Sequence, residues 1–463
     1  MDGMIATRRT FLGAMTAASY QRVLGANDRV QLGLIGYGLI GAKHVETFKK
    51  QPDAEFAGIC DVYAPRVDAG IAACGAPAKG YRDFRELLGN KDIQAVIIAT
   101  PDHWHALQTI LACAAGKDVY VEKPMTLFVR EGRWMVNAAR RYQRVVQVGT
   151  QQRSGKHYQK ARQLMQDGAI GRIHSIHMSS HRNVMPGFGD PPDGTPPAGL
   201  DYDMWLGPAP RRAYNPQRCL YHFRWFWDYS GGQMTNLGQH NLDIVHWVMQ
   251  VKGPQAVVSC GGRLALTADN GNTPDTQDAI LEYAGGGWSQ AADRRKPGFT
   301  VTVSIREACR GVTRSDFEFC GTKGSLTIGR GGFKINPDPK VHPANMIPNW
   351  SNPPGHPPRM DTGQALWTEP LEAKGDSDEQ LDLHARNLLD CIKNRQRPIA
   401  DVEDGHEVAT ACHLANISLW VGRKLQWNAA TEEIIGDPEA ASHLIRPYRE
   451  PWDEVLHATG VAS

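Results

Sequence analysis

The chain has 463 residues, which is long enough to bury two hydrophobic cores, so two domains are expected. Its 51 Lys and Arg residues nearly balance its 49 Asp and Glu residues, with no long block of one sign. This balance argues against nucleic acid or a membrane surface as a partner. The nine cysteines form no C-x-x-C pair, and therefore predict neither a disulfide framework nor a zinc site.

The first residues resemble an export signal. The sequence TRRTFL, from Thr7 to Leu12, is similar to a twin-arginine signal. The apolar run that follows it is far shorter than the roughly 20 residues that a membrane-spanning helix needs. We therefore expect residues 1–26 to direct export to the periplasm. The alternative is an uncleaved basic arm on a cytoplasmic protein.

A glycine-rich turn after the first apolar strand, VQLGLI, predicts dinucleotide binding. It has the pattern G-x-G-x-x-G, in which Gly36 allows a tight turn, Gly38 lets the backbone approach a pyrophosphate, and Gly41 lets the helix pack closely. The helix is expected to begin near Leu39. The phosphates would then lie on the unpaired N–H groups of its first residues, Leu39 and Ile40.

The next expected strand, residues 54–60, ends in Asp61, twenty positions after Gly41. An acidic side chain at this point accepts hydrogen bonds from the ribose hydroxyls and repels a 2′-phosphate. The sequence therefore predicts NAD and makes NADP the less expected cofactor, although the nearby Arg66 weakens that preference. A glycine-rich turn without any ligand is the alternative.

Strands and helices alternate from residue 27 to residue 149, which predicts a Rossmann domain with a parallel sheet. Two further strands are expected over residues 95–99 and 118–121. Residues that follow strands at their carboxyl ends line the ligand crevice of such a sheet. The residues placed at the cofactor on this ground are Thr100, Pro101, His105, Glu122 and Lys123.

These motifs resemble those of the glucose-fructose oxidoreductase, inositol dehydrogenase and MocA family of NAD(P)-dependent sugar oxidoreductases. Besides the glycine-rich turn and Thr100-Pro101 with His105, the resemblance rests above all on Glu122-Lys123-Pro124. It continues through Gln151 to Arg153, Gly238-Gln239-His240 with Asp243, and Pro398 to Asp401. It implies an α/β protein in which an N-terminal Rossmann domain precedes an α+β domain with a mostly antiparallel open sheet. It also implies a homo-oligomer, a dimer or tetramer, built on that sheet.

The second domain is expected at residues 150–427, followed by a C-terminal tail at residues 428–463. Strand-like runs over residues 173–179, 256–260, 278–283, 300–305 and 317–320 agree with an antiparallel sheet. Two Pro- and Gly-rich stretches, residues 185–216 and 336–358, predict irregular lids or subunit contacts. Helices are expected over residues 156–166, 236–249, 377–394 and 404–423, the third capped by Ser377.

Oxidation of a carbinol needs a hydride acceptor, a group that takes the hydroxyl proton, and positive charge beside the developing alkoxide. Lys123 can supply that charge, and a lysine that faces phosphate or solvent is the alternative. The resemblance makes His240 the catalytic base. Where the family commonly has an aspartate four residues earlier, this chain has Asn236, which can orient an imidazole but not stabilise its protonated form. Either Asp243 supplies the missing charge, or Lys123 carries the proton.

We expect the substrate, a small carbohydrate, to contact Asn236, His240 and Asp243, and also Arg153 and His157 after the domain junction. A metal is not predicted, because His240, Asp243 and His246 do not share one helical face.

In residues 221–229 every odd position is aromatic. On a strand this would place five rings, including that of Trp227, on one face suited to the apolar side of a sugar. A packed core or interface strand is the alternative.

Together these features predict an NAD-dependent oxidoreductase that acts on a ring hydroxyl of a sugar, glycoside or cyclic polyol. One alternative is a redox-neutral glycosidase, in which bound NAD oxidises a ring carbon transiently. The Tyr-Pro-Thr-His-Gly stretch that often marks this class is absent from residues 233–239. A further alternative is a non-catalytic nucleotide-binding regulator, against which the presence of both Lys123 and His240 argues.

Overall fold

The computed structural model describes residues 29–75, 77–283, 298–310, 317–340 and 365–462. The predicted twin-arginine segment and most of the second proline-rich stretch lie outside these residues. None of the helices in the described ranges could span a lipid bilayer.

The N-terminal part of the chain forms a parallel sheet of six strands in the order β3-β2-β1-β4-β5-β6. The strands are β1 (Val30–Ile35), β2 (Ala54–Cys60), β3 (Lys79–Tyr81), β4 (Ala95–Ile98), β5 (Asp118–Val121) and β6 (Val146–Val148). The connecting helices are α2 (Leu39–Lys49), α3 (Ala64–Cys74), α4 (Phe84–Gly89), α5 (Asp102–Ala114) and α6 (Val129–Arg141). The predicted Rossmann domain is confirmed.

The strand order of this sheet locates its ligand crevice. β1 lies between β2 and β4, so the chain leaves β1 toward one edge of the sheet and later returns to its other side. In open parallel sheets a ligand binds outside the carboxyl ends of the strands at such a reversal. All four residues of β4 and of β5 are buried, as expected for strands that are covered by helices on both faces.

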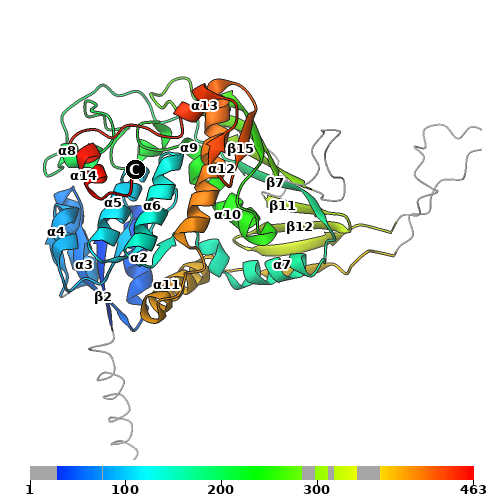
Figure 1. Cartoon of the computed structure of the whole chain (residues 1–463), viewed down its shortest axis with the longest axis horizontal. Coiled ribbons are helices and arrows are strands. Elements are labelled where there is room, and N and C mark those ends of the chain that lie inside the picture. The colour runs from blue at the N-terminus through cyan, green and yellow to red at the C-terminus, as the bar shows by residue number, and fades with distance from the viewer. Residues whose placement is uncertain (1–28, 76, 284–297, 311–316, 341–364, 463) are drawn as a thin grey trace, which may run out of the picture.

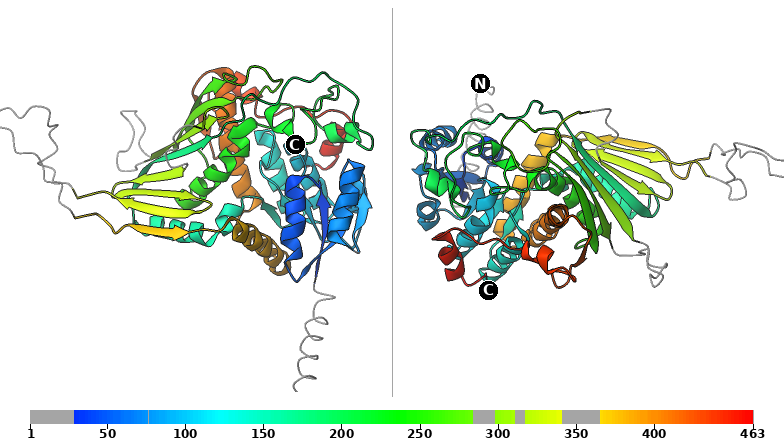
Figure 2. Two further views of the ribbon diagram at one scale, coloured as in Figure 1. Left: turned by 180° about the vertical axis from the view of Figure 1, so that it is seen from behind. Right: turned by 90° about the horizontal axis from the view of Figure 1, so that it is seen from above.

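The second sheet has ten strands in the order β14-β13-β12-β11-β7-β10-β9-β8-β15-β16. β7 (Ile173–His181) runs parallel to β10 (Phe299–Arg306), and the other paired strands are antiparallel, so the sheet is mixed but mostly antiparallel, as predicted. The remaining strands are β8 (Ala256–Gly262), β9 (Thr276–Tyr283), β11 (Phe317–Gly321), β12 (Gly324–Gly329), β13 (Gly332–Pro337), β14 (Leu371–Lys374), β15 (Leu425–Asn428) and β16 (Glu433–Ile434). Figure 2 shows this sheet extending away from the Rossmann domain.

Helices cover one face of the second sheet. They include α7 (Lys156–Gln166), α10 (Gly238–Met249) and α12 (Val402–Val421), and α12 also packs against α6 of the first domain. β10 shows the alternation that a half-covered sheet requires, since Val301, Val303 and Ile305 are buried and the residues between them are not. The buried side chains form one core with those of the helices.

Two predicted helices differ in detail. The helix expected over residues 236–249 begins two residues later, as α10, and Asn236 is instead the last residue of a separate short helix, α9 (Gly232–Asn236). Helix α11 (Ser377–Asn394) has the predicted bounds, but Asp376 caps it instead of Ser377, because the Asp376 carboxylate accepts hydrogen bonds from the N–H groups of Asp378 and Glu379. The loop expected over residues 185–216 contains one short helix, α8 (Tyr202–Leu206).

The late part of the chain returns to the first domain, as Figure 1 shows for α11 and α14 (Trp452–Ala458). Leu388 and Leu389 of α11 belong to the same core cluster as the side chains of β1. The ring of Trp452 packs edge-on against Trp104 at a centroid distance of 4.8 Å. The segments after residue 370 therefore help to hold the two sheets together.

Candidate active site

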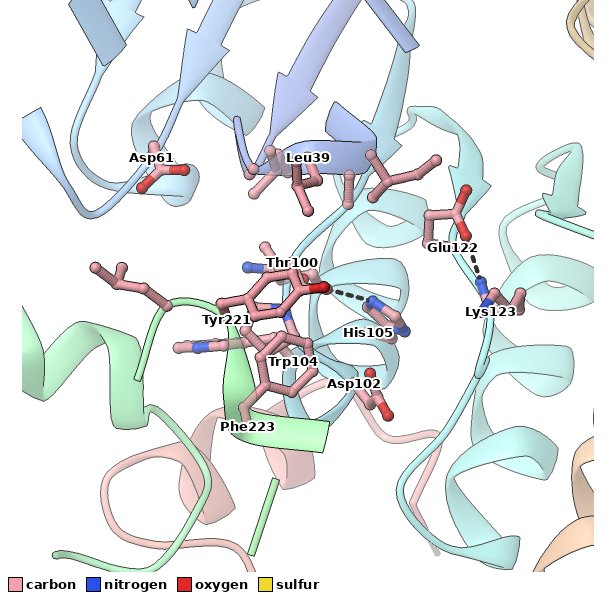
Figure 3. Close-up of a pocket in the computed structure, with 18 of the residues that line it drawn as sticks. Leu39, Asp61, Thr100, Asp102, Trp104, His105, Glu122, Lys123, Tyr221 and Phe223 are labelled. Atoms are coloured by element: carbon pink, nitrogen blue, oxygen red, sulfur yellow. Dashed lines mark hydrogen bonds between the residues drawn. The ribbon is translucent and has the colours of Figure 1, made fainter. Parts of the chain in front are cut away.

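A cleft with a volume of about 350 Å³ lies at the carboxyl edge of the first sheet. This volume lies within the roughly 300–1,000 Å³ typical of a small-molecule site. Its lining comes from the turns after β1, β2, β4 and β5, from the aromatic segment near residue 222, from α10, and from the turn between β12 and β13. Figure 3 shows how the side chains of the first domain surround it.

The glycine-rich turn forms one end of the cleft. Gly36 has a φ of +95°, which a residue with a side chain rarely adopts, and a Cβ on Gly41 would lie 2.0 Å from the Gly36 carbonyl oxygen. Gly38 is open, and within the described part of the chain the Arg66 guanidinium is the one group near its Cβ position, at 3.8 Å. Among the residues that the structure describes, no side chain caps α2, whose first residues are Leu39 and Ile40. This arrangement leaves backbone donors for a pyrophosphate, so the turn fits a dinucleotide.

Asp61 lies at the end of β2, in the cleft lining. Its carboxylate accepts hydrogen bonds from the N–H groups of Tyr37 at 2.8 Å and Tyr63 at 2.9 Å. Burial raises the pKa of Asp61, against the opposing charge of Arg66. Because each carboxylate oxygen has a second lone pair, the side chain can still accept from ribose hydroxyls.

The turns after β4 and β5 are tied together by His105. One ring nitrogen, Nδ1, lies 2.6 Å from the Pro124 carbonyl oxygen, and Nε2 lies 2.8 Å from that of Thr100. Glu122 accepts a hydrogen bond from the Lys123 N–H at 3.0 Å, and its other oxygen lies 2.7 Å from His44 Nε2. Thr100, Pro101, His105, Glu122 and Lys123 all line the cleft, but His105 and Glu122 use their polar atoms to fix the turns.

Lys123 is half-buried and its ammonium group is held by Asn236. The Nζ donates to the Asn236 carbonyl oxygen at 2.9 Å and to its side-chain Oδ1 at 2.8 Å. Burial lowers the pKa of Lys123 to about 8, with Glu122 opposing this shift and Arg224 adding to it. Asn236 therefore contacts the lysine in this structure, although the sequence pattern suggested that it would orient His240.

His240, in the first turn of α10, also lines the cleft. Burial and the charges of Lys123 and Arg330 hold the pKa of His240 well below its ordinary value, so the ring is neutral at neutral pH. The Nε2 atom lies 3.4 Å from Nη2 of Arg330. Since a guanidinium can only donate, Nε2 accepts and the ring proton is on Nδ1, which has no hydrogen-bond partner among the described residues.

Sequence reasoning missed Arg330, which lies between β12 and β13. Neither strand was predicted, so nothing in the local pattern indicated that this turn reaches the cleft. The turn is fixed by His157, whose Nε2 lies 3.0 Å from the Gly329 carbonyl oxygen, and by Gln380, whose Nε2 donates to the Arg330 carbonyl oxygen at 3.2 Å. His157, predicted as a substrate contact, lies outside the cleft lining and holds this turn.

Arg153 and Asp243, two other predicted substrate contacts, form a buried ion pair with 2.8 Å between Nε and Oδ2. Nη1 of Arg153 also donates to the Asp404 carboxylate and to the Ile399 carbonyl oxygen, both at 3.1 Å. Neither member of the pair belongs to the cleft lining. The Asp243 carboxylate is thus bonded to Arg153 and not to His240.

The predicted aromatic strand over residues 221–229 is wrong. Residues His222–Trp225 form a 3-10 helix, η2, whose tighter i to i+3 hydrogen bonds continue into the bond from the Phe226 N–H to the Phe223 carbonyl oxygen. Only Tyr221 and Phe223 among the five predicted rings line the cleft. Trp227 packs edge-on against Trp420 at 4.8 Å and lies outside the lining.

The rings of Trp225 and Tyr229 are buried in a small core cluster with Trp205. Among the described residues, no group of three or more His, Cys, Asp or Glu side chains is arranged to hold a metal ion.

Comparison with known proteins identifies both parts of the fold. Residues 30–150 match the oxidoreductase family with an NAD-binding Rossmann fold (GFO_IDH_MocA), and residues 182–260 and 370–454 match its C-terminal alpha/beta domain. A myo-inositol 2-dehydrogenase from Thermotoga maritima is 28% identical over 253 residues, which are 54% of this chain and 64% of that protein. A glycosyl hydrolase family 109 protein from a Shewanella species is 30% identical over 154 residues, which are 32% of this chain and 34% of that protein.

The chain spans about half the length of the curated relatives that it matches. Among solved structures, a levoglucosan dehydrogenase in complex with NADH and levoglucosan has a TM-score of 0.60 at 19% identity. The alignment covers 86% of this chain and 99% of that one. At this level of identity the similarity establishes a shared fold.

Proposed function

We propose that this chain, which belongs to the GFO_IDH_MocA oxidoreductase family, is an NAD-dependent oxidoreductase that acts on a ring hydroxyl of a sugar, glycoside or cyclic polyol. The observation that carries the proposal is the meeting of Lys123 and His240 in one cleft with the glycine-rich turn and Asp61. The curated inositol dehydrogenase relative supports the choice of a cyclic polyol or sugar.

Each side chain has a defined part in this proposal. When bound, NAD supplies the hydride acceptor. The ammonium group of Lys123, oriented by Asn236, stabilises the alkoxide that develops on the reacting oxygen. The neutral ring of His240 takes the hydroxyl proton on Nε2, and for this the Arg330 guanidinium must yield its present place at 3.4 Å to the substrate.

The direct test uses the purified protein with bound nucleotide and a panel of inositols, sugars and glycosides. The proposal predicts that at least one of them produces the absorbance of reduced nicotinamide, which persists until an external acceptor or a ketose is added. If no cyclic polyol or sugar reduces the bound nucleotide, although the nucleotide is present in the protein, the proposal is wrong.

A redox-neutral glycosidase is the second candidate, and the family 109 relative favours it. Such an enzyme needs the same cleft, because the ring carbon is oxidised and then reduced again in one catalytic cycle. Nitrophenyl glycosides separate the two candidates. Release of nitrophenol without a lasting change in nicotinamide absorbance supports the glycosidase, whereas lasting reduction without release supports the dehydrogenase.

We propose further that the protein is exported to the periplasm by its twin-arginine sequence, with Arg8 and Arg9 as the recognised pair. Fusion of residues 1–30 to a reporter that matures only after folded export tests this. The fusion should reach the periplasm, and replacement of both arginines by lysine should keep it in the cytoplasm.

A homo-oligomer on the open face of the second sheet is proposed as well. Val258 and Ile280 on neighbouring strands are 37% and 44% exposed on a face that helices leave uncovered. Light scattering after gel filtration should give a dimer or tetramer mass, and a monomer at all concentrations would contradict it.

A further inference from the structure

We propose that the substrate end of the cleft, which is the part beside Lys123 and His240, recognises an anionic group on the sugar, a carboxylate or a phosphate, through the guanidinium groups of Arg224 and Arg330. This inference rests on the proposed function and names the class of its substrate. The charged side chains that line the cleft differ from one another: some are bonded to partners of opposite charge or to backbone groups within the protein, and others, among the described residues, have no such ion pair.

Among the described residues, three carboxylates line the cleft, and all three are already bonded within the protein. Asp61 accepts from two backbone N–H groups, Asp102 accepts from the Ser230 hydroxyl, and Glu122 accepts from the Lys123 N–H and faces His44. The described lysine and arginine side chains of the lining are Arg66, Lys123, Arg224 and Arg330. Within the described ranges, neither Arg224 nor Arg330 forms an ion pair with a carboxylate.

Two hydrogen bonds fix the turn that places Arg330 in the cleft. His157 contacts the Gly329 carbonyl oxygen, and Gln380 donates to the Arg330 carbonyl oxygen. The guanidinium then lies 3.4 Å from His240, and its charge lowers the pKa of both His240 and Lys123. A neutral sugar would leave this repulsion between cations in place, whereas an anionic group beside Arg330 would relieve it.

Arg224, which belongs to η2, lines the same cleft as Arg330. Its guanidinium carbon lies 4.5 Å from the centre of the Phe223 ring, and Nη1 donates to the Tyr221 carbonyl oxygen at 3.1 Å. The charge of Arg224 also lowers the pKa of Lys123. Stacking and one backbone contact fix the plane of the group and leave other N–H donors for a ligand, which suits bidentate binding of a carboxylate or phosphate.

The pyrophosphate of the nucleotide is expected elsewhere, on the glycine-rich turn. Arg66 is the cation beside that turn, 3.8 Å from the Cβ position of Gly38. The charges of Arg224 and Arg330 instead lower the pKa of Lys123, and the charge of Arg330 lowers the pKa of His240 as well. An anion at these two arginines would therefore belong to the substrate and lie next to the reacting hydroxyl.

The test measures binding to the NADH-loaded enzyme by calorimetry, with three probes that share one ring. These are methyl glucoside, methyl glucuronide and glucose 6-phosphate. We expect at least one anionic probe to bind about tenfold or more tightly than methyl glucoside, with a preference that weakens as salt is added. The uronide and phosphate arms show which anion the site accepts.

Arg330→Gln and Arg224→Gln should each reduce this preference by about tenfold, because each removes one charge-assisted pair of hydrogen bonds. Arg211→Gln is the matched control, since the Arg211 side chain is 81% exposed and lies outside the cleft lining. It should leave the preference unchanged. Thermal melting and the affinity for NADH are recorded for every variant to show that the fold and nucleotide site are intact.

Equal binding of the three probes by the parent enzyme would overturn the inference, as would an anion preference that survives both arginine substitutions. Loss of NADH affinity in the two variants would assign the arginines to the nucleotide and also overturn it. If neutral sugars are oxidised while anionic ones do not bind, only the inference fails. If an anionic probe binds with the expected dependence and no sugar is oxidised, the proposed reaction fails instead.

Discussion

The two ends of the cleft are built in different ways. The nucleotide end comes from the turns after β1, β2, β4 and β5, and its shape is set by backbone geometry at Gly36 and Gly41. The substrate end joins Lys123 of the first domain to His240 and Arg330 of the second, more than 100 and 200 positions further along the chain. The geometry of the cofactor site is thus determined by short segments of the first domain. The geometry of the substrate site depends on how the first and second domains pack against each other.

The largest effect is expected at the point where the two ends join. Lys123→Ala should lower kcat by about 10²–10⁴-fold, because it removes the positive charge beside the developing alkoxide, and should leave NADH affinity nearly unchanged. Single-turnover kinetics and NADH titration measure the two quantities. Lys156→Ala, at a side chain that is 73% exposed, is the control. Substantial turnover by Lys123→Ala would remove the lysine from the reaction.

A large effect on stability, without a direct effect on the nucleotide end, is expected for the buried ion pair between Arg153 and Asp243 of α10. Asp243→Ala leaves the Arg153 charge without its buried partner and should lower the free energy of unfolding by about 3–5 kcal/mol. Urea denaturation of the protein without substrate measures this. Asp404→Ala removes the other, 44% exposed partner of Arg153 and should cost about 1 kcal/mol or less.

An effect of Asp243→Ala on substrate binding instead of stability would support the role predicted from the sequence, in which Asp243 contacts the substrate. If Asp243→Ala has parental stability and instead loses affinity for the sugar, the carboxylate contacts substrate and not chiefly Arg153.

The pH dependence separates the two roles considered for Lys123. The charged ammonium is present below its pKa of about 8 and lost above it. If the lysine acts as a cation, kcat/KM should fall about tenfold per pH unit above this value. Lys123→Arg should remove the alkaline fall, because the guanidinium keeps its charge. A rate that rises through pH 8 would make neutral Lys123 the base.

A smaller effect is expected at the ribose end. Asp61→Ala removes an acceptor for the ribose hydroxyls and the repulsion of a 2′-phosphate, so NAD affinity should fall by about tenfold and the preference over NADP should narrow. Nucleotide titration of both cofactors measures this, with Asp68→Ala on the exposed side of α3 as the control. An unchanged ratio of the two affinities would show that Arg66 or the backbone sets the preference.

The difference between the two ends of the cleft also explains which site residues and strands could be predicted from the sequence. Gly36, Gly41 and Asp61 were found because their roles follow from chain geometry within a short segment. The Rossmann sheet and the five predicted strands of the second sheet were found from apolar runs and glycine-rich turns. The short strands β12 and β13 were missed, and with them Arg330, because strands that are rich in glycine and polar residues give a weak pattern.

The other predictions that differ from the structure, those for Arg153, His157 and the aromatic segment, depend on tertiary contacts that a local sequence pattern does not show. Arg153 and His157 follow the domain junction in sequence, but their polar atoms are used by Asp243 and by the Gly329 carbonyl oxygen. The alternating aromatics around Trp225 suggested a strand, but the chain forms a 3-10 turn there, because Phe223, Trp225 and Tyr229 pack into one core cluster that outweighs the period-two pattern.

The central claim is that this cleft transfers hydride from a ring carbinol to the nicotinamide that its first domain binds. The most direct measurement uses the nucleotide-loaded enzyme and a cyclic polyol or sugar that carries deuterium on its carbinol carbons. Mass spectrometry of the released nucleotide should show one deuterium in the reduced nicotinamide, and the label should not depend on the solvent. Reduced nucleotide without deuterium, or no reduced nucleotide with any labelled sugar that binds, would contradict the account.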